Sequence, residues 1–479
     1  METSQTKWIC AQLGAREHYA IPRALHAEGL LAGLFTDAWV EPGNPLGLLK
    51  RSLRERYHAE LADAAVLSAN VPLLAFEAGA RVKGWTGWNR IMARNEWFQR
   101  QILKKLKTEM LKAALGQRDS GQRDDGQRGA EGGELTKAES GKQKAEKLKS
   151  GDTSPGAHLI RPAATFSPER RRESPQSGEE VNFQHSTRNS QPILFSYSYT
   201  ALELFRFAKS RGWKTVLGQI DAGPEMGRIV HRLEQQHPEY QSRSDAPPKN
   251  YWEAWRDECA LADRIVVNSE WSRQALEWEG IRAGKIRVVP LAYVPPSEAA
   301  AFRREYPPAF SLQRPMRVLF LGQINPAKGL APLLEAAEIL RGEPVEFRMV
   351  GPVQVAVPEK WRRHPQIRWI GPVPRGTVAE HYRTADVFVF PTFSDGFGLT
   401  QLEAQAWKLP VIASRFCGDV VEDGVNGLQL AGVSGTSIAH ALRSLLAAPG
   451  KLSDMAQASG VGPQFSLAGI AGRILTLFS

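Results

Sequence analysis

The sequence predicts an α/β protein built from two doubly wound parallel sheets. Its 479 residues exceed what one compact core accommodates and suit two domains. Short apolar, β-branched runs alternate with helical stretches over most of the chain, which is the order of βα units. The runs are continuously apolar, as in strands that helices cover on both faces. We therefore expect ligands in a cleft between the sheets, at the carboxyl ends of the strands.

The predicted strands fall into two sets. The first set contains Trp8–Leu13, Ile193–Tyr197, Thr215–Ile220, Arg264–Asn268 and Ile286–Pro290. The second set contains Arg317–Leu321, Glu346–Val350, Ile367–Ile370, Val387–Phe390 and Val411–Ala413. Helices are predicted between the strands, for example Leu330–Leu340 and Leu399–Trp407. The proline-rich stretch Pro290–Pro315 separates the sets, which places the first domain at 1–295 and the second at 296–464.

A long polar segment, residues 116–190, interrupts the first domain. It is rich in Gly, Ser, Gln and charged residues, and it repeats the motif Gly-Gln-Arg from Gly116 onward. Such a composition cannot bury enough apolar surface to offset the entropy of ordering. We predict a disordered insertion, with a regulatory or partner-binding tract as the alternative.

Composition narrows the class of protein. The net charge of +10 indicates an anionic partner, such as nucleic acid, an acidic membrane surface or a phosphorylated substrate. Cys10, Cys259 and Cys417 are far apart, which argues against disulfides or a zinc site. No apolar run approaches the length of a membrane span, and residues 1–8 lack the pattern of a secretory signal. We expect a cytoplasmic protein.

One stretch, residues 388–404, combines several features of a ligand site. A strand ends at Pro391, Asp395 follows, Gly396 and Gly398 allow close approach of a ligand to the backbone, and a helix begins near Leu399. Amides at a helix start favour anions. Glu403 lies eight positions after Asp395 on that helix, and its carboxylate suits vicinal hydroxyls such as those of a ribose. The alternative for Asp395 is a helix N-cap.

An earlier loop offers a cation for the same ligand. The strand that ends at Leu321 continues into Gly322–Gly329, which carries Gln323 and Lys328 just before the next helix. Lys328 is placed to neutralise a phosphate. The alternative is an ordinary surface lysine.

These loops, with Pro410–Ser414, Val421–Gly427, Leu261–Glu270 and Lys285–Pro290, resemble glycosyltransferase family 4. The resemblance extends over nearly everything from Ile193 to Leu430. It implies a GT-B architecture: two Rossmann-like domains, with a nucleotide-sugar donor held mainly by the second and an acceptor mainly by the first. It also implies that residues 465–479 form a terminal helix that returns to the first domain.

The resemblance assigns roles residue by residue. The family's pair of acids falls on Asp395 and Glu403, and the second is similar to the acid that holds the donor ribose. The expected donor-binding residues are Gly14, Arg16, Gln323, Lys328, Gly351, Val373, Gly396, Phe397, Gly398, Leu399 and Glu403. Two positions depart from the family pattern: Asp395 replaces the usual glutamate, and Gln323 replaces a frequent arginine. Arg16 is expected to supply charge that Gln323 lacks.

The first domain lacks a histidine that the family commonly places after a strand like Thr215–Ile220. Asp221 or Gln219 is expected to take that polar role, so Asp221 joins Asp395 and Glu403 as a candidate catalytic residue. The alternative for Asp221 is a turn-forming residue before Gly-Pro.

The stretch 81–112 is basic and aromatic. It holds nine Lys/Arg against two Asp/Glu, with Trp85, Trp88, Trp97 and Phe98 among them. Three interpretations fit: contact with an anionic membrane that presents a lipid-linked acceptor, binding of nucleic acid, or aromatics packed beneath solvated charges. The first gives a peripheral position at the inner face of the membrane. Nucleic acid fits the family resemblance least well.

The resemblance implies a retaining transfer of a hexose-type sugar to an acceptor hydroxyl, on a lipid-linked or polysaccharide precursor. No Asp-x-Asp triplet is present, so we expect no metal, no tightly bound cofactor, and a nucleotide-diphosphate sugar as co-substrate. The chain has neither a P-loop nor a dinucleotide fingerprint, which disfavours kinases and dehydrogenases. The alternative, motivated by Gln323 and the missing histidine, is a non-catalytic sugar-nucleotide-binding protein or scaffold.

Overall fold

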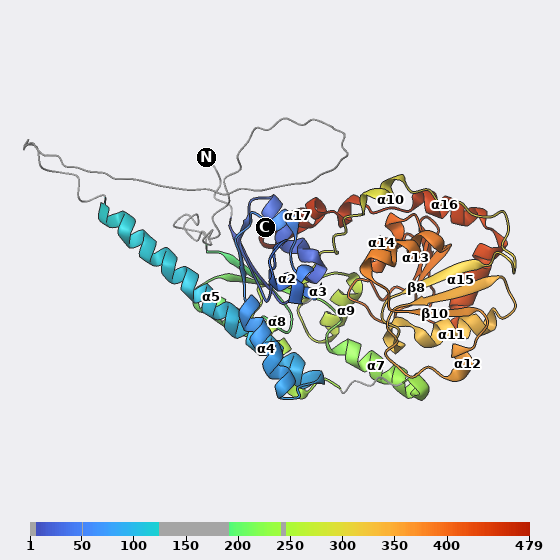
Figure 1. Cartoon of the computed structure of the whole chain (residues 1–479), viewed down its shortest axis with the longest axis horizontal. Coiled ribbons are helices and arrows are strands. Elements are labelled where there is room, and N and C mark those ends of the chain that lie inside the picture. Colours follow the sequence, from blue (N-terminus) through green and yellow to red (C-terminus); the bar gives the residue numbers. More distant parts are fainter. Residues whose placement is uncertain (1–5, 50, 124–190, 241–245) are drawn as a thin grey trace, which may run out of the picture. The chain divides into compact units, whose positions relative to one another are not determined.

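A computed structural model describes residues 6–49, 51–123, 191–240 and 246–479. Contacts between residues divide the chain into two units. One unit comprises residues 1–110 and 181–479, and the other comprises residues 111–180. The first unit contains two parallel sheets with helices on both faces, which confirms the predicted fold class (Figure 1). Residues 124–190 of the predicted insertion lie outside the described residues.

The first sheet has seven parallel strands in the order β3-β2-β1-β4-β5-β6-β7. They are β1 (Trp8–Gln12), β2 (Leu31–Thr36), β3 (Val66–Ser68), β4 (Ile193–Tyr197), β5 (Lys214–Gln219), β6 (Arg264–Val267) and β7 (Ile286–Val288). The sequence did not predict β2 and β3, because β2 contains Ala and Gly and β3 has only three residues. The strand order reverses between β1 and β4, so the turn after β1 lies at a topological switch point.

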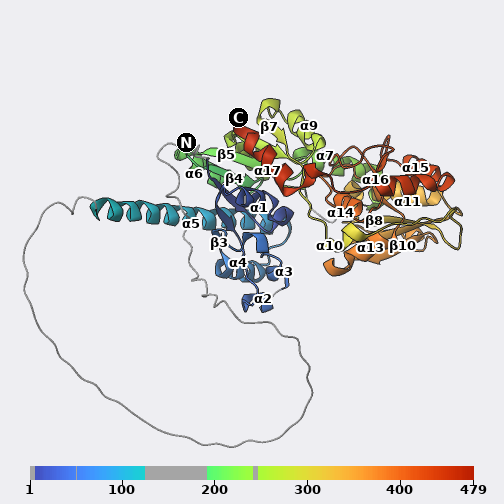
Figure 2. The same cartoon turned by 90° about the horizontal axis from the view of Figure 1, so that it is seen from above.

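Helices cover both faces of the first sheet (Figure 2). They are α1 (Ala20–Ala27), α2 (Leu46–Leu49), α3 (Arg51–Arg54), α4 (Asn70–Val82), α5 (Gly87–Arg123), α6 (Leu202–Ser210), α7 (Pro224–Gln236), α8 (Lys249–Leu261) and α9 (Glu270–Trp278). Alternate residues of β1 point to opposite faces, so Ile9 lies in one apolar core and Cys10 in another. Residues 116–123, which were assigned to the insertion, belong to α5.

The second sheet has six parallel strands in the order β10-β9-β8-β11-β12-β13. They are β8 (Met316–Leu321), β9 (Val345–Val350), β10 (Ile367–Gly371), β11 (Val387–Phe390), β12 (Val411–Ala413) and β13 (Gly427–Gln429). The helices are α11 (Leu330–Ile339), α12 (Glu359–Arg362), α13 (Val378–Thr384), α14 (Thr400–Ala406), α15 (Gly435–Ala447) and α16 (Gly450–Ala458). Here the order reverses between β8 and β11, so the loops after these neighbouring strands emerge at the same edge of the sheet.

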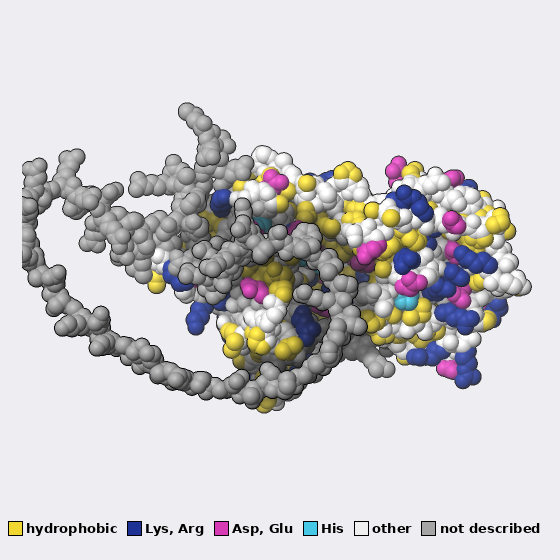
Figure 3. Space-filling view, turned by 45° about the horizontal axis from the view of Figure 1, so that its top comes forward, with side chains coloured by type: hydrophobic (Ala, Val, Ile, Leu, Met, Phe, Trp, Pro, Cys, Tyr) yellow, Lys and Arg dark blue, Asp and Glu magenta, His cyan; other side chains and the backbone are white. Residues whose placement is uncertain are grey.

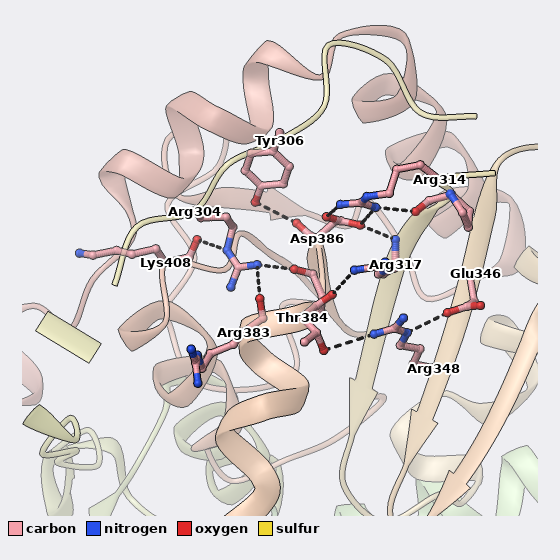
Figure 4. Close-up of polar contacts among 12 residues, drawn as sticks. Arg304, Tyr306, Arg314, Arg317, Glu346, Arg348, Arg383, Thr384, Asp386 and Lys408 are labelled. Carbon is pink, nitrogen blue, oxygen red and sulfur yellow. Dashed lines mark hydrogen bonds and ion pairs between the residues drawn. The ribbon is translucent and has the colours of Figure 1, made fainter. Parts of the chain in front are cut away.

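The predicted linker contains a short helix, α10 (Ser297–Ala301), and is tied to the second domain by polar contacts (Figure 4). The Arg304 guanidinium donates hydrogen bonds from Nη2 and Nε to the carbonyls of Tyr382, Trp407 and Lys408, at 2.8, 2.9 and 3.0 Å. Arg314 pairs with Asp386 through two hydrogen bonds of 2.7 Å. The hydrogen bonds from Arg304 satisfy carbonyls at the ends of α13 and α14, which otherwise have no helical partner.

The basic, aromatic stretch 81–112 places much of its aromatic surface inside the protein. Trp97 and Phe98 of α5 are buried in the core of the first domain, and the Trp97 ring lies 5.2 Å from that of Phe76. Trp85 and Trp88 are half-buried. The structure thus supports packing for Trp97 and Phe98. Within the described ranges, no helix combines the length and apolarity that crossing a bilayer requires.

Charge on the second domain is mixed in sign. Figure 3 shows Lys and Arg side chains interspersed with Asp and Glu over the part of the surface that this domain presents. Some ion pairs of this domain join a helical residue to one just beyond the end of the helix, for example Glu338 of α11 with Arg341 and Glu359 of α12 with Arg363. Exposed pairs of this kind contribute little to stability.

The last helix, α17 (Leu467–Leu475), packs against α1 of the first domain. Its Ile470 and Ile474 are 1% and 2% exposed and belong to the same apolar core as Trp8 and Tyr19. Beyond the helix, Arg264 Nε of β6 donates to the carbonyl of Leu477 at 2.8 Å. The end of the chain therefore contributes to the core of the first domain.

We predict that Ile474→Ala lowers the free energy of unfolding by about 2–4 kcal/mol, because it leaves a cavity in this core. Leu475→Ala on the same helix is the control, since Leu475 is 40% exposed and its truncation should cost less than about 1 kcal/mol. Urea denaturation followed by circular dichroism measures both. Equal losses for the two variants would show that α17 does not pack as described.

Candidate functional site

The loops after β8 and β11 meet through an ion pair. Lys328 closes the short helix η6 (Pro326–Lys328), and its Nζ lies 2.5 Å from Asp395 Oδ2. The two loops are joined by backbone as well, since Phe393 N donates to the carbonyl of Ala327 at 2.8 Å. Gly329 has a φ of +82°, and a Cβ there would lie 2.1 Å from the carbonyl oxygen of Pro391. Only glycine allows this approach.

Both carboxylate oxygens of Asp395 have partners. Oδ2 pairs with Lys328, and Oδ1 accepts a hydrogen bond of 3.0 Å from the backbone N–H of Phe397. The second bond shapes the turn that leads into α14, so Asp395 also acts within its own loop. The ion pair neutralises Asp395 and fixes the direction of the lysine side chain.

A cavity of about 470 Å³ opens beside this ion pair. Residues from both domains line it: Arg16, Glu17, Ile220, Asn268, Leu291, Phe320, Leu321, Gly322, Gln323, Lys328, Phe390, Asp395, Phe397, Gly398, Leu399 and Thr400. The structure therefore brings seven of the predicted site residues together: Arg16, Gln323, Lys328, Asp395, Phe397, Gly398 and Leu399. Its volume is in the range of small-molecule sites.

Four other predicted residues do not line the cavity. Gly396 has no room for a side chain, because a Cβ would lie 2.0 Å from the carbonyl oxygen of Ile220. Gly351 has a φ of +132°, with a Cβ position 1.8 Å from the carbonyl oxygen of Gly322. Gly14 donates its N–H to Asp37 Oδ1 at 2.9 Å. Val373 packs against an apolar cluster of the second domain.

Glu403 lies one turn inside α14. Tyr382 Oη, from α13, donates a hydrogen bond of 2.6 Å to Glu403 Oε2. Burial raises the pKa of Glu403, while the tyrosine hydrogen bond and the positive charge of Arg375 act in the opposite direction. Glu403 does not line the cavity as the described residues define it. Its role in holding a donor stays a prediction.

Asp221, the candidate from the first domain, is part of a polar network after β5. Its Oδ1 accepts hydrogen bonds from Tyr199 Oη at 2.7 Å, Gln219 Nε2 at 2.8 Å and Gly223 N at 2.9 Å. Burial raises its pKa. Gln219 in turn accepts a hydrogen bond from Trp255 Nε1. This arrangement fits the turn-forming alternative, and Asp221 does not line the cavity.

Glu17 is a cavity residue that the sequence did not single out. It lies in η1 (Arg16–Tyr19), the turn after β1, where Glu17, His18 and Tyr19 have φ values of 52°, 50° and 59°. Three successive non-glycine residues in the left-handed region are unusual. Burial raises the pKa of Glu17 to about 7, although the hydrogen bond from Tyr197 and the charge of Arg16 lower it. The sequence feature that points to Glu17 is an acidic residue in the turn that follows the first strand.

Comparison with known proteins identifies the domain that contains most of the site. Residues 315–448 match the family model described as "Glycosyl transferases group 1". The second domain thus resembles a group 1 glycosyl transferase domain. The match includes Gln323, Lys328, Asp395 and Glu403, whereas the first-domain residues lie outside it.

Two curated relatives are similar over part of their length. The chain is 34% identical over 211 residues to the D-inositol 3-phosphate glycosyltransferase of Geodermatophilus obscurus, covering 39% of this chain and 46% of that protein. It is 32% identical over 222 residues to the enzyme of the same name from Kribbella flavida, covering 41% and 51%. The chain thus spans about half the length of the curated relatives it matches.

A solved structure extends the likeness to both domains. A glycosyltransferase from Rickettsia africae aligns over 98% of this chain and 97% of its own, with a TM-score of 0.51 and 14% sequence identity. The likeness concerns the fold alone. Together with the two parallel sheets, it assigns the GT-B architecture to this protein.

We predict that Glu17→Gln stabilises the protein at pH 8 but not at pH 5. The pKa of the Glu17 carboxyl group is near 4.5 in the unfolded chain and about 7 in the folded protein. Between these pH values the unfolded chain loses this proton while the folded protein keeps it, so the free energy of unfolding falls as the pH rises. Glutamine removes this loss, which we put at about 1–3 kcal/mol at pH 8.

Urea denaturation at both pH values measures the effect. Glu28→Gln is the matched control, since Glu28 is exposed at the end of α1 and its substitution should change stability equally at both. A Glu17→Gln difference that does not vary with pH would show that Glu17 is not held in a buried, neutral-favouring environment.

Proposed function

We propose that this protein is a retaining glycosyltransferase that moves a hexose-type sugar from a nucleotide-sugar donor to an acceptor hydroxyl. One observation supports this most strongly: the cavity that adjoins the Lys328–Asp395 ion pair is lined by the group 1 domain on one wall and by the first βα turn on the other. A donor and an acceptor held by different domains would meet there. Carbohydrate chemistry fits the mixture of charged, glycine and apolar residues in its lining.

The donor would bind chiefly to the second domain. Lys328 and Arg16 line the cavity and carry the positive charge that a diphosphate requires. The backbone of Gly398 and Leu399 is open to close approach, and Glu403 would accept hydrogen bonds from the ribose hydroxyls. Gln323 would contribute a neutral hydrogen bond where a cation is more usual in such sites.

The transfer step would need little from protein side chains. The acceptor oxygen forms a bond to the anomeric carbon as the bond from that carbon to the diphosphate oxygen breaks. The acceptor's proton passes to the departing phosphate on the same face, so the anomeric configuration is kept. Lys328 and Arg16 would stabilise the charge that develops on the diphosphate. No metal and no tightly bound cofactor take part in this scheme, and the nucleotide sugar is a co-substrate.

The acceptor would belong to a membrane or polysaccharide precursor. The basic residues of 81–112 lie on the first domain, and exposed apolar side chains such as Val82, at 90% exposure, accompany them. Such a surface suits peripheral binding to an anionic membrane from the cytoplasmic side. D-inositol 3-phosphate, which the names of the curated relatives mention, is a second acceptor to test.

A second candidate is a sugar-nucleotide-binding protein without catalysis. Two observations favour it: Gln323 lines the cavity in place of a cation, and Asp395 neutralises Lys328. The two functions differ in one measurable property. A transferase releases nucleoside diphosphate from the nucleotide sugar, whereas a binding protein does not.

The test combines a thermal-shift screen with an assay for nucleoside diphosphate release. UDP-, GDP- and ADP-glucose are the donors, and D-inositol 3-phosphate and octyl α-D-glucopyranoside are the probe acceptors. We predict that one donor raises Tm and that Lys328→Ala weakens its binding about tenfold or more, since a charged hydrogen bond to phosphate is lost. Glu403→Ala should also weaken it.

Lys360→Ala is the matched control, because Lys360 is an exposed lysine of α12 in the same domain. Its donor binding should equal that of the wild type. Binding without diphosphate release would favour the non-catalytic function. An unchanged affinity in Lys328→Ala and Glu403→Ala would contradict the proposed donor site.

A further inference from the structure

The carboxylate of Glu17 has one oxygen engaged and one available. Tyr197 Oη, at the end of β4, donates a hydrogen bond of 2.9 Å to Oε2. Within the part of the chain that the structure describes, Tyr197 is the one hydrogen-bond partner of this carboxylate. Since Glu17 lines the cavity, Oε1 remains available to a molecule that enters it.

The backbone that carries Glu17 is held in a strained form by its surroundings. The following residue pair, His18 and Tyr19, shares the positive φ, and each such residue costs roughly 1–2 kcal/mol. Tyr19 is 1% exposed, its ring packs edge-on against Trp39, and its Oη donates to the carbonyl of Arg56. Arg23 Nη1 donates to the carbonyl of His18 at 3.3 Å. These contacts determine where the turn directs Glu17.

The charges around Glu17 indicate what kind of group it would meet. Four ionisable residues line the cavity: Arg16, Glu17, Lys328 and Asp395. Asp395 is already paired, and the two cations attract a diphosphate, which an ionised Glu17 would repel. Because the pKa of Glu17 is about 7, the group is a carboxylate at pH 8. A carboxylate accepts hydrogen bonds and donates none, so hydroxyl groups are its natural partners in a sugar-binding cavity.

The wall of the cavity to which Glu17 belongs is that of the first domain. Its neighbours in this wall are Ile220, Asn268 and Leu291, which follow strands β5, β6 and β7. Arg16 lies beside Glu17 in this wall, but the other residues proposed to meet the diphosphate, Lys328, Gly398 and Leu399, lie in the wall of the second domain. A hydroxyl that meets Glu17 therefore comes from a molecule bound to the first domain.

We propose that Glu17 binds the acceptor substrate, with its available oxygen accepting a hydrogen bond from an acceptor hydroxyl other than the one that attacks the sugar. This inference rests on the proposed function. The attacking hydroxyl gives its single proton to the phosphate, so a neighbouring hydroxyl is the partner of Glu17. Tyr197 positions the carboxylate, and the left-handed turn directs it into the cavity.

The experiment compares acceptor and donor parameters in Glu17 variants, with the donor and probe acceptor on which the wild type is most active. Glu17→Gln removes the negative charge of the oxygen that accepts the hydrogen bond from the substrate. We expect the KM for the acceptor substrate to rise about tenfold. The dissociation constant of the donor should stay unchanged or fall, because the variant removes a charge that repels the diphosphate, and the rate of donor hydrolysis without acceptor should not decrease. Glu28→Gln should match the wild type in all three.

A second variant guards against misfolding. Glu17→Asn introduces a residue that tolerates the left-handed region and has a shorter side chain. We expect an acceptor KM at least as high as in Glu17→Gln, and a circular dichroism spectrum like that of the wild type. Weaker donor binding in Glu17→Gln would place Glu17 on the donor sugar and overturn the proposal. An unchanged acceptor KM in both variants would also overturn it. A wild type that shows no transfer with any donor and acceptor would instead contradict the proposed function itself.

Discussion

The site depends on one loop, residues 391–399, that both domains hold in place. From the first domain, Trp271 Nε1 donates a hydrogen bond of 3.0 Å to Ser394 Oγ, and the backbone at Ile220 leaves no room for a side chain at Gly396. From the second domain, Ala327 and Lys328 contact the same loop. A small apolar cluster that includes Trp271 and Phe393 adds to these contacts. The position of Asp395 therefore reflects the packing of both domains at once.

Because both domains contact this loop, residues of both domains line the cavity. The second domain contributes the lysine and the glycine-rich turn, and the first domain contributes a strained turn with an acid. In the proposed function, the second domain holds most of the donor, and the first βα turn supplies Arg16 to the diphosphate and Glu17 to the acceptor. The Lys328–Asp395 pair keeps the lysine directed into the cavity, at the cost of part of its charge.

Much of the fold could be predicted from sequence, because buried parallel strands are continuous apolar runs. The predicted ends of the strands in both sets agree with the observed ends to within one or two residues. The strands β2, β3 and β13 were not predicted, because a short strand is stabilised by pairing in the sheet more than by the propensity of its own residues. The helical content of 116–123 was missed because its composition is polar throughout.

The site was predictable in its local motifs and less so in its long-range pairs. Lys328 and Asp395 were each recognised from their loops, yet their ion pair joins positions 67 residues apart in sequence. The sequence shows that Glu17 lies in the first βα turn but not that its side chain lines the cavity, because its direction depends on positive φ angles that non-glycine residues adopt only under tertiary packing, here around Tyr19. Glu403 and Asp221 were placed on the correct elements, but their position outside the cavity lining follows from side-chain packing against Tyr382 and Tyr199.

The most direct measurement is a crystal structure of the protein with the nucleoside diphosphate sugar that stabilises it most. We predict that the diphosphate lies within hydrogen-bond distance of Lys328 Nζ, that the ribose lies beside Glu403, and that the sugar points toward the wall that carries Glu17. A nucleotide bound elsewhere, with the Lys328–Asp395 pair intact and the cavity empty, would contradict this account.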